Sequence, residues 1–226
     1  MRQVGHLALG RAAYGPVLGL QRRLHERRRA GEVGDLLLSV EHDPVITLGR
    51  AASPAHLRAG REELDRLGVE VVAVERGGDV TYHGPGQLVL YPILDLRHFG
   101  RDLHRYVAGL EEVMICTAAA FGAAAGRRAG LPGVWVGERK LGSVGVHVRG
   151  WVTCHGLALN LQLEPNWFSL IVPCGLAGVE AVDVAEVTGR PVPWNRALSA
   201  AVTAFSDVFG VRVVPLAEEA VTSWAR

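Results

Sequence analysis

The sequence predicts an α/β (α+β) fold, a single domain over residues 1–226 with a mixed, largely antiparallel sheet flanked by helices. Two patterns predict it. Short alternating or β-branched segments recur along the whole chain, and amphipathic segments with helical spacing lie between them. In addition, 49% of the 226 residues are hydrophobic, which suffices for a buried core. Since no repeat, low-complexity tract or linker interrupts the chain, one domain is the simplest organisation.

The N-terminal part alternates between sheet and helix. Apolar residues alternate in the strand segments, and an Arg-rich helical segment separates the first two strands. The second helix ends at Gly68, because glycine readily adopts the left-handed conformation that terminates helices. The expected elements are strands at 3–9, 35–40, 44–48 and 69–74, and helices at 12–29 and 61–67.

The C-terminal part contains the longest amphipathic helices. One apolar stripe follows Asp102 and ends at Gly122, and a second ends at Gly210. Between them, alternating segments predict antiparallel strands, with a hairpin turn at Arg149-Gly150. The expected elements are helices at 102–122 and 198–209, strands at 134–136, 144–148, 151–161 and 211–214, and a last helix after residue 214.

Several functional classes are disfavoured by composition. No apolar stretch reaches the roughly 20 residues of a membrane span, and the N-terminus lacks the apolar core of a signal peptide, so a cytoplasmic protein is expected. A net charge of +1 gives no overall footprint for nucleic acid. Five arginines nevertheless gather on the first helix, either as a solvated face or as a docking site for an acidic protein. They are Arg22, Arg23, Arg27, Arg28 and Arg29.

Three cysteines form an odd set without a CxxC pair, which predicts free thiols. Cys174 lies between Pro173, which fixes φ, and Gly175, which frees it, so the loop can present a thiol in a set orientation. Cys174 is therefore the candidate nucleophile, with an inert buried thiol as the alternative. Cys154 in an alternating strand is interpreted as a small apolar filler, and Cys116 as a core residue of its helix. A zinc site formed with His155 lacks paired ligand spacing, and no metal or other cofactor is expected.

Lys140 is the single lysine in a chain with 23 arginines. A guanidinium stays protonated at any workable pH, whereas a partly desolvated amine can exchange a proton near neutrality. Lys140 is therefore a candidate general base, and chance survival in an Arg-rich composition is the alternative.

Glycines are dense between Arg76 and Gln87, where four occur in twelve residues. Such density indicates a backbone that approaches a ligand closely, with a tight hairpin that includes His83 as the alternative. Neither a GxGxxG nor a GxxxxGK[ST] spacing is present, which disfavours a phosphate loop.

Four stretches together resemble the lipoyl(octanoyl) transferase family. They are Arg76–Gln87 with the following LVLYPI, GVWV leading to Lys140, HGLALN at 155–160, and PCG at 173–175. The resemblance extends from about Val40 to Gly175 and implies the fold of the biotin and lipoate protein ligases. Leu141-Gly142 differs from the residues that relatives often have there, as does Cys154 before the histidine, but neither is a catalytic position.

The resemblance implies transfer of an octanoyl group from acyl carrier protein, through a thioester on Cys174, to a lysine of a lipoyl domain. Lipoyl domains of 2-oxoacid dehydrogenase E2 subunits and the glycine cleavage H protein are the implied acceptors. Lys140 is implied to take the thiol proton, hold the thiolate and later help to deprotonate the incoming amine. The implied substrate-binding residues are Arg76, Gly77, Gly78, Asp79, Val80, Thr81, Tyr82, His83, Ser143, Val144, Gly145, Gly156, Leu157 and Ala158.

Three alternatives remain open. An ATP-dependent lipoate or biotin ligase of the same fold needs no cysteine nucleophile, so an intact Pro173-Cys174-Gly175 argues against it. A cysteine hydrolase would use His83 or His155 as its base and would leave Lys140 without a role. A binding module for acylated carriers would show no turnover.

Overall fold

An eight-stranded main sheet has the order β11-β1-β2-β6-β10-β9-β8-β7 in the computed structural model, which describes residues 1–175 and 178–216 apart from the side chain of Cys174. Strand β1 pairs in parallel with β2 and β11, and the other pairings are antiparallel. The predicted mixed, largely antiparallel sheet is confirmed. The strands are β1 Arg2–Ala12, β2 Asp35–His42, β6 Gln87–Ile93, β7 Gly126–Arg128, β8 Leu131–Val136, β9 Arg139–Arg149, β10 Val152–Asn160 and β11 Val211–Pro215.

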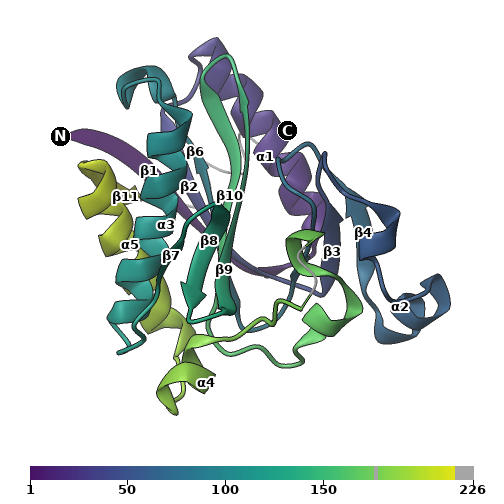
Figure 1. Cartoon of the computed structure of the whole chain (residues 1–226). Helices are drawn as coiled ribbons and strands as arrows, with labels where there is room; N and C mark the ends of the chain where they lie inside the picture. The colour runs from purple at the N-terminus through teal and green to yellow at the C-terminus, as the bar shows by residue number, and fades with distance from the viewer. Residues whose placement is uncertain (176–177, 217–226) are drawn as a thin grey trace.

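Helices cover both faces of the main sheet (Figure 1). Helices α3 (Leu103–Ala119) and α5 (Trp194–Phe209) pack on one face, where Met114 and Phe205 join the largest apolar core. Helix α1 (Tyr14–Ala30) covers the other face, and its Leu24 lies in a second core with residues of β2 and β6. Short helices lie in the connections. They are α2 (Arg61–Leu67), α4 (Val184–Thr188), η1 (Pro54–His56), η2 (Leu96–His98), η3 (Trp167–Leu170) and η4 (Pro173–Gly175).

A second sheet of three strands lies beside the main one, in the order β4-β3-β5. It contains β3 (Val45–Leu48), β4 (Glu70–Ala73) and β5 (Val80–His83), and its apolar side packs on α2 and η3. Because β5 pairs with β3 while β6 pairs with β2 and β10, the chain passes from one sheet to the other between them. The tight-hairpin alternative for the glycine-rich segment is therefore wrong.

Local signals in the sequence explain most element ends. The side chain of Asp102 accepts a hydrogen bond from the backbone N–H of Arg105 at 3.0 Å and caps α3. Gly150 and Trp151 both have positive φ, at 59° and 67°, which is what a two-residue type I′ turn between β9 and β10 requires. The turn predicted at Arg149-Gly150 is thus present. The expected last helix lies outside the described residues, except for its first positions up to 216.

The two cysteines with described side chains differ from each other. Cys154 is 2% exposed in β10, as expected for a small filler. Cys116 is exposed on α3, so the prediction that it is a core residue is wrong. Its side chain lies one helical turn from Glu112, at 3.7 Å, on the solvent side of the amphipathic helix. In the described part of the chain, no helix combines the length and the apolarity needed to cross a bilayer.

Candidate active site

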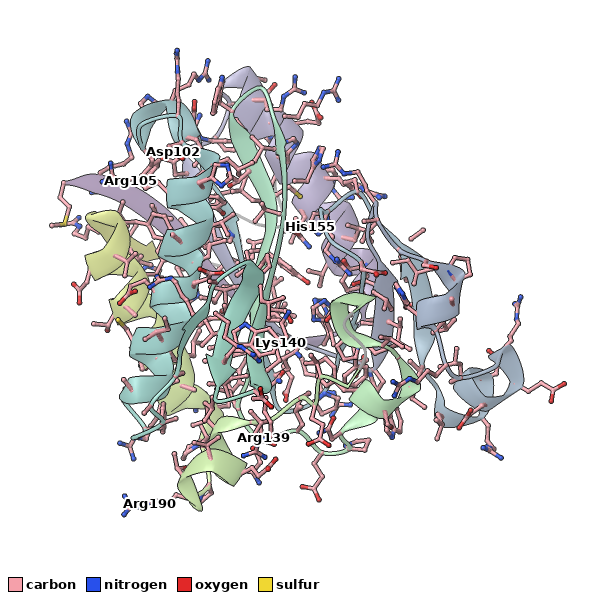
Figure 2. The ribbon with its side chains drawn as sticks, in the orientation of Figure 1. Asp102, Arg105, Arg139, Lys140, His155 and Arg190 are labelled. Atoms are coloured by element: carbon pink, nitrogen blue, oxygen red, sulfur yellow. The ribbon has the colours of Figure 1, made fainter. Side chains whose placement is uncertain are left out.

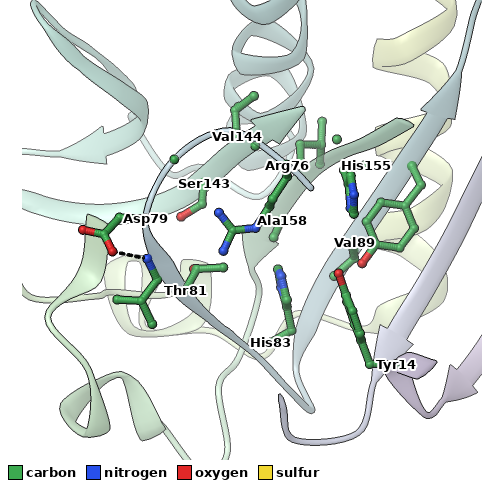
Figure 3. Close-up of a pocket in the computed structure, with 16 residues that line it drawn as sticks. Tyr14, Arg76, Asp79, Thr81, His83, Val89, Ser143, Val144, His155 and Ala158 are labelled. Carbon is green, nitrogen blue, oxygen red and sulfur yellow. Dashed lines mark hydrogen bonds between the residues drawn. The ribbon is translucent and has the colours of Figure 1, made fainter. Parts of the chain in front are cut away.

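A cavity lies where the segment 76–83 crosses over the middle of strands β9 and β10 (Figure 3). Together with the open solvent at its mouth, the space it encloses is about 470 Å³. Asp79 and Ser143 lie toward one end of it and His155 and Tyr14 toward the other. Its wall is formed by Tyr14, Arg76, Gly78, Asp79, Val80, Thr81, His83, Val89, Tyr91, Ser143, Val144, Gly145, His155, Gly156, Leu157 and Ala158.

The cavity brings together most of the residues expected to bind substrate, from three separate stretches of sequence. The two exceptions are Gly77 and Tyr82. The backbone N–H of Gly77 donates to the carbonyl of Val146 at 2.9 Å, which fastens the glycine segment to β9. The Tyr82 side chain points away from the cavity and packs edge-on against Phe168, with ring centres 5.5 Å apart. This follows from the alternation of side chains along β5.

Two glycines allow the backbones to approach at this point. Gly145 of β9 and Gly156 of β10 lie directly opposite each other, next to the pair Ser143 and Ala158 two positions along. A β-carbon on Gly145 would lie 2.9 Å from Cδ of Arg76, and one on Gly156 would lie 2.2 Å from the carbonyl oxygen of Leu90. Any larger residue would therefore push neighbouring groups aside and narrow the cavity.

Arg76 braces the glycine segment. Its guanidinium donates to the carbonyl oxygen of Thr47 at 2.7 Å, to the Thr47 hydroxyl at 2.8 Å and to the Gly77 carbonyl at 3.0 Å. The residue is buried between the two sheets, where a planar fork of donors can hold several acceptors at once. It thus fixes the segment that closes the cavity.

Lys140 lies near the start of β9 and is 5% exposed (Figure 2). Its backbone N–H donates to the carbonyl of Glu180 at 2.8 Å, and its carbonyl accepts from the N–H of Val182 at 3.0 Å. Its side-chain nitrogen lies 5.2 Å from the centre of the Trp135 ring, within the range of a cation–π contact. The side chain also passes Gly133, where a β-carbon would lie 3.0 Å from Cε of Lys140.

The backbone of Cys174 forms the middle of η4, while its side chain lies outside the described part of the structure. The turn is adjacent to the cavity wall, because a β-carbon on Gly175 would lie 2.6 Å from Oδ2 of Asp79. Just before it, the N–H of Val172 donates to the carbonyl of His56 at 2.8 Å. The structure therefore places the turn of the predicted nucleophile beside the Asp79 end of the cavity.

The opposite end of the cavity contains buried imidazoles and phenols. Burial lowers the pKa of His83 to about 3, and its Nδ1 is 2.6 Å from Oε1 of Gln87. Burial also lowers the pKa of His155, which has a φ of 59° and an Nε2 that lies 3.9 Å from Glu75. The hydrogen bond with Arg22 holds the pKa of Glu75 well below its usual range. Since burial makes an imidazole a weaker base, these two histidines do not support the cysteine-hydrolase alternative.

Four wall residues were not expected from the sequence. They are Tyr14, Val89, Tyr91 and His155. Val89, Tyr91 and His155 lie in recognised stretches, so their positions there were the available signal. Tyr14 belongs to α1, and no local pattern connects it with a segment sixty residues later. Among the described side chains, no group of three or more His, Cys, Asp or Glu could hold a metal ion.

Comparison with known families decides how this geometry is interpreted. Residues 13–206 match the model of the lipoyl protein ligase A/B catalytic domain, which covers most of the chain. The chain therefore belongs to the lipoyl protein ligase A/B catalytic domain family. Within this family, an octanoyltransferase of Solibacter usitatus is 51% identical over 168 residues, which are 74% of this chain and 76% of that protein. The resemblance found in the sequence is confirmed.

Solved structures of the same fold include a lipoate protein ligase and a biotin protein ligase. A bi-partite lipoate protein ligase from Thermoplasma acidophilum matches with a TM-score of 0.73 at 17% identity, over 100% of this chain and 91% of that one. A biotin protein ligase from Aquifex aeolicus, in complex with biotin and ATP, matches with a TM-score of 0.56 at 13% identity, over 91% and 70% of the two chains. At these identities the likeness shows the fold, and the predicted fold of the biotin and lipoate protein ligases is confirmed.

Proposed function

We propose that the chain, acting as one catalytic domain, transfers an octanoyl group from acyl carrier protein to lipoyl domains through a thioester on Cys174. Octanoyl transfer, an acyltransferase activity in lipoate assembly, follows from the family and its curated octanoyltransferase relatives. The single observation that supports the covalent route is the position of η4, whose Cys174-Gly175 backbone borders the cavity at Asp79.

In the first step, Lys140 accepts the proton of the Cys174 thiol, and the thiolate attacks the carbonyl carbon of the octanoyl thioester. A new C–S bond forms, and the bond to the carrier sulfur breaks. The carrier thiolate leaves with a proton from Lys140. In the second step, the amine of the acceptor lysine attacks the Cys174 thioester, the C–N bond forms and the Cys174 thiolate is released.

The cavity is suited to an acyl chain. The four residue pairs along β9 and β10, from Ser143 and Ala158 to Val146 and His155, span three residue steps, or roughly 10 Å of strand. An extended eight-carbon chain has a similar length. Val89, Val144 and Leu157 supply apolar wall, and Gly145 and Gly156 leave space between them. The chain would then extend from the Asp79 end toward Tyr14 and Tyr91.

The expected partners are octanoyl-acyl carrier protein as donor and, as acceptors, lipoyl domains of 2-oxoacid dehydrogenase E2 subunits and the glycine cleavage H protein. A cytoplasmic location is proposed with them, since both kinds of partner belong to central metabolism. No cofactor enters either step.

Intact-mass spectrometry tests the proposal. The protein is mixed with octanoyl-acyl carrier protein without ATP, and the expected result is a mass increase of one octanoyl group that is absent in Cys174→Ala. Addition of a lipoyl domain should discharge the acyl-enzyme and acylate the domain. An absolute requirement for ATP with free octanoate would instead identify a ligase. A protein that binds the acylated carrier without acquiring mass or turning over would be a binding module.

A further inference from the structure

The proposed transfer, on which this inference rests, leaves one proton without an assigned acceptor. An acceptor lysine enters as an ammonium and ends as an amide nitrogen, so it loses two protons. One of them restores the ammonium of Lys140, which gave its proton to the leaving carrier thiolate in the first step. The second proton must pass to another group and then to solvent. A base that faces both the reacting turn and solvent would meet this need.

His56 and Asp79 form a hydrogen-bonded pair beside the cavity wall. Nδ1 of His56 lies 2.5 Å from Oδ2 of Asp79, while Oδ1 of Asp79 accepts hydrogen bonds from the backbone N–H groups of Val80 at 2.7 Å and Ser53 at 3.2 Å. Because a carboxylate can only accept here, Nδ1 must hold a proton. The lone pair of the neutral ring therefore lies on Nε2, which is the arrangement of a carboxylate-oriented imidazole base.

The pair borders the turn that contains Cys174. A β-carbon on Gly175 would lie 2.8 Å from Cε1 of His56, the ring carbon bonded to both nitrogens. Nε2 is bonded directly to Cε1, the atom of the His56 ring that lies nearest to the turn. The backbone around His56 runs alongside the same segment, since Leu57 forms a β-bridge with Ile171 and the N–H of Arg58 donates to the carbonyl of Leu170 at 2.9 Å. These contacts hold the backbone at His56 beside the segment that leads into η4.

Among the histidines at or beside the cavity, His56 has the access to solvent that proton release requires. Its side chain is 28% exposed, and that of Asp79 is 12% exposed. His42, His83 and His155 are buried, and burial lowers the pKa of each of them. Neither the buried rings nor the aspartate, which is already engaged by three donors, can take a proton at the cavity mouth and release it to water.

We propose that Nε2 of His56, oriented by Asp79, accepts the second proton of the acceptor amine during amide formation. The amine nitrogen first gives one proton to the neutral amine of Lys140 and attacks the thioester carbon. The tetrahedral adduct then gives its remaining excess proton to His56 as the C–S bond to Cys174 breaks. The imidazolium is stabilised by the Asp79 carboxylate until it releases the proton to solvent. Asp79 is a positioning residue in this scheme, because it acts through His56.

The test separates the two steps. Acyl-enzyme formation from octanoyl-acyl carrier protein, and its discharge to a lipoyl domain, are measured as single turnovers by rapid quench and intact mass. In His56→Ala, acylation is expected to stay within about twofold of wild type, while discharge slows about 10²-fold, the usual loss for a missing base. Imidazole added to this variant should restore part of the discharge rate, which a purely structural role would not allow.

Asp79→Asn provides a second and milder change. An asparagine can turn its NH₂ toward Nδ1 of His56, which moves the ring proton to Nε2 and blocks the lone pair. Discharge should slow at least tenfold more than acylation does, and imidazole should not restore it because the ring still fills its site. His98→Gln is the matched control, since His98 is also partly exposed and lies 3.9 Å from an aspartate, Asp95, away from the cavity.

Three results would overturn the assignment. If both steps slow equally, His56 and Asp79 only support the structure of the turn. If the discharge rate is unchanged, the pair has no role in proton transfer. If imidazole does not speed discharge in His56→Ala, His56 is not the proton acceptor. If His56→Ala fails to fold, Asp79→Asn decides by the same comparison. Failure of the proposed function itself is separate, because it appears as the absence of an acyl-enzyme in wild type.

Discussion

The side-chain nitrogen of Lys140 lies 5.2 Å from the centre of the Trp135 indole ring. An indole face attracts an ammonium by about 0.5–2 kcal/mol, so Trp135 holds the charged end of Lys140 in place. Trp135→Leu should therefore slow acyl-enzyme formation about tenfold, whereas Trp135→Phe should retain most of the rate. Quenched-flow mass measurements give these rates, and thermal unfolding reports the packing lost with the large ring. An unchanged rate in Trp135→Leu would contradict this role.

Lys140→Arg separates charge from proton transfer. The guanidinium keeps the positive charge but cannot serve as a base, so transfer should fall by about 10²-fold or more. Cys174 should still react with iodoacetamide in this variant, since a nearby cation favours the thiolate, and should lose that reactivity near neutrality in Lys140→Ala. Near wild-type turnover of Lys140→Arg would show that Lys140 supplies only charge.

Replacement of Cys174 by serine or alanine should abolish transfer and leave the fold intact, because the covalent route is lost while little volume changes. Cys154→Ala is the matched control. Cys154 lies in β10 beside the cavity wall, and burial raises the pKa of its thiol to about 12, so it should neither react with iodoacetamide at neutral pH nor be needed for turnover. An inactive Cys154 variant together with an active Cys174 variant would reverse the assignment.

The arginine cluster of α1 is expected to stabilise the fold more than to recognise a partner. Arg22 is paired with Glu75 at 2.8 Å, and the buried Arg28 with Asp35 at 2.8 Å. Arg28→Glu should therefore lower the free energy of unfolding by about 3 kcal/mol or more, because it leaves a buried carboxylate without its partner. Arg23→Glu changes an exposed residue and should alter neither stability nor the KM for either protein substrate.

A salt series on the Arg23 variant completes this test. A raised KM for the acyl carrier, with a weaker salt dependence and an unchanged kcat, would restore the docking hypothesis for the exposed part of the cluster.

Stability should fall in mild acid because of the buried histidines. Burial lowers the pKa of His42 to about 4, below its unfolded value, so protons bind the unfolded chain first as the pH decreases. The contribution of His42 is complete above about pH 6.5 and is lost between there and about pH 4, and it amounts to about 3 kcal/mol. Urea unfolding at pH 7 and pH 4.5 measures it. His42→Gln should show a smaller difference between the two pH values, and an equal difference would contradict the assignment.

The sequence predicts those parts of the fold that depend on local periodicity. Helices α2, α3 and α5, the turn at Gly150 and strands β1 to β4 and β11 follow from apolar spacing and from residues that end helices, all within a few positions. Strand β6 was missed because Pro92 lies within it, although it is central in the sheet. A proline has no N–H for the strand ladder and argues against a central strand, and only the neighbouring strands show that this position tolerates it.

Sequence motifs predicted most residues of the cavity wall. Reasoning from the chemistry of single residues did not predict all of the site. Glycine density located the segment 76–83, because backbone that approaches a ligand needs glycine at a few fixed points, and the family resemblance located the pair Gly145 and Gly156. His56 was missed, since nothing in Ser53-Pro54-Ala55-His56 marks it and its significance arises from Asp79, far along the chain. Side chains that act together through tertiary contacts leave no local spacing to detect.

The two-residue turn at Gly150 and Trp151 sets the registration of the cavity wall. Strands β9 and β10 pair from Arg149 and Val152 at the turn to Gly145 and Gly156 at the cavity, without a recorded shift between them. Because side chains alternate with a period of two, a slip of one residue in this pairing would turn one wall of the cavity to the opposite face of the sheet, roughly 13 Å away from the turn. A solvent-exposed turn that fixes the pairing therefore determines which side chains face the cavity.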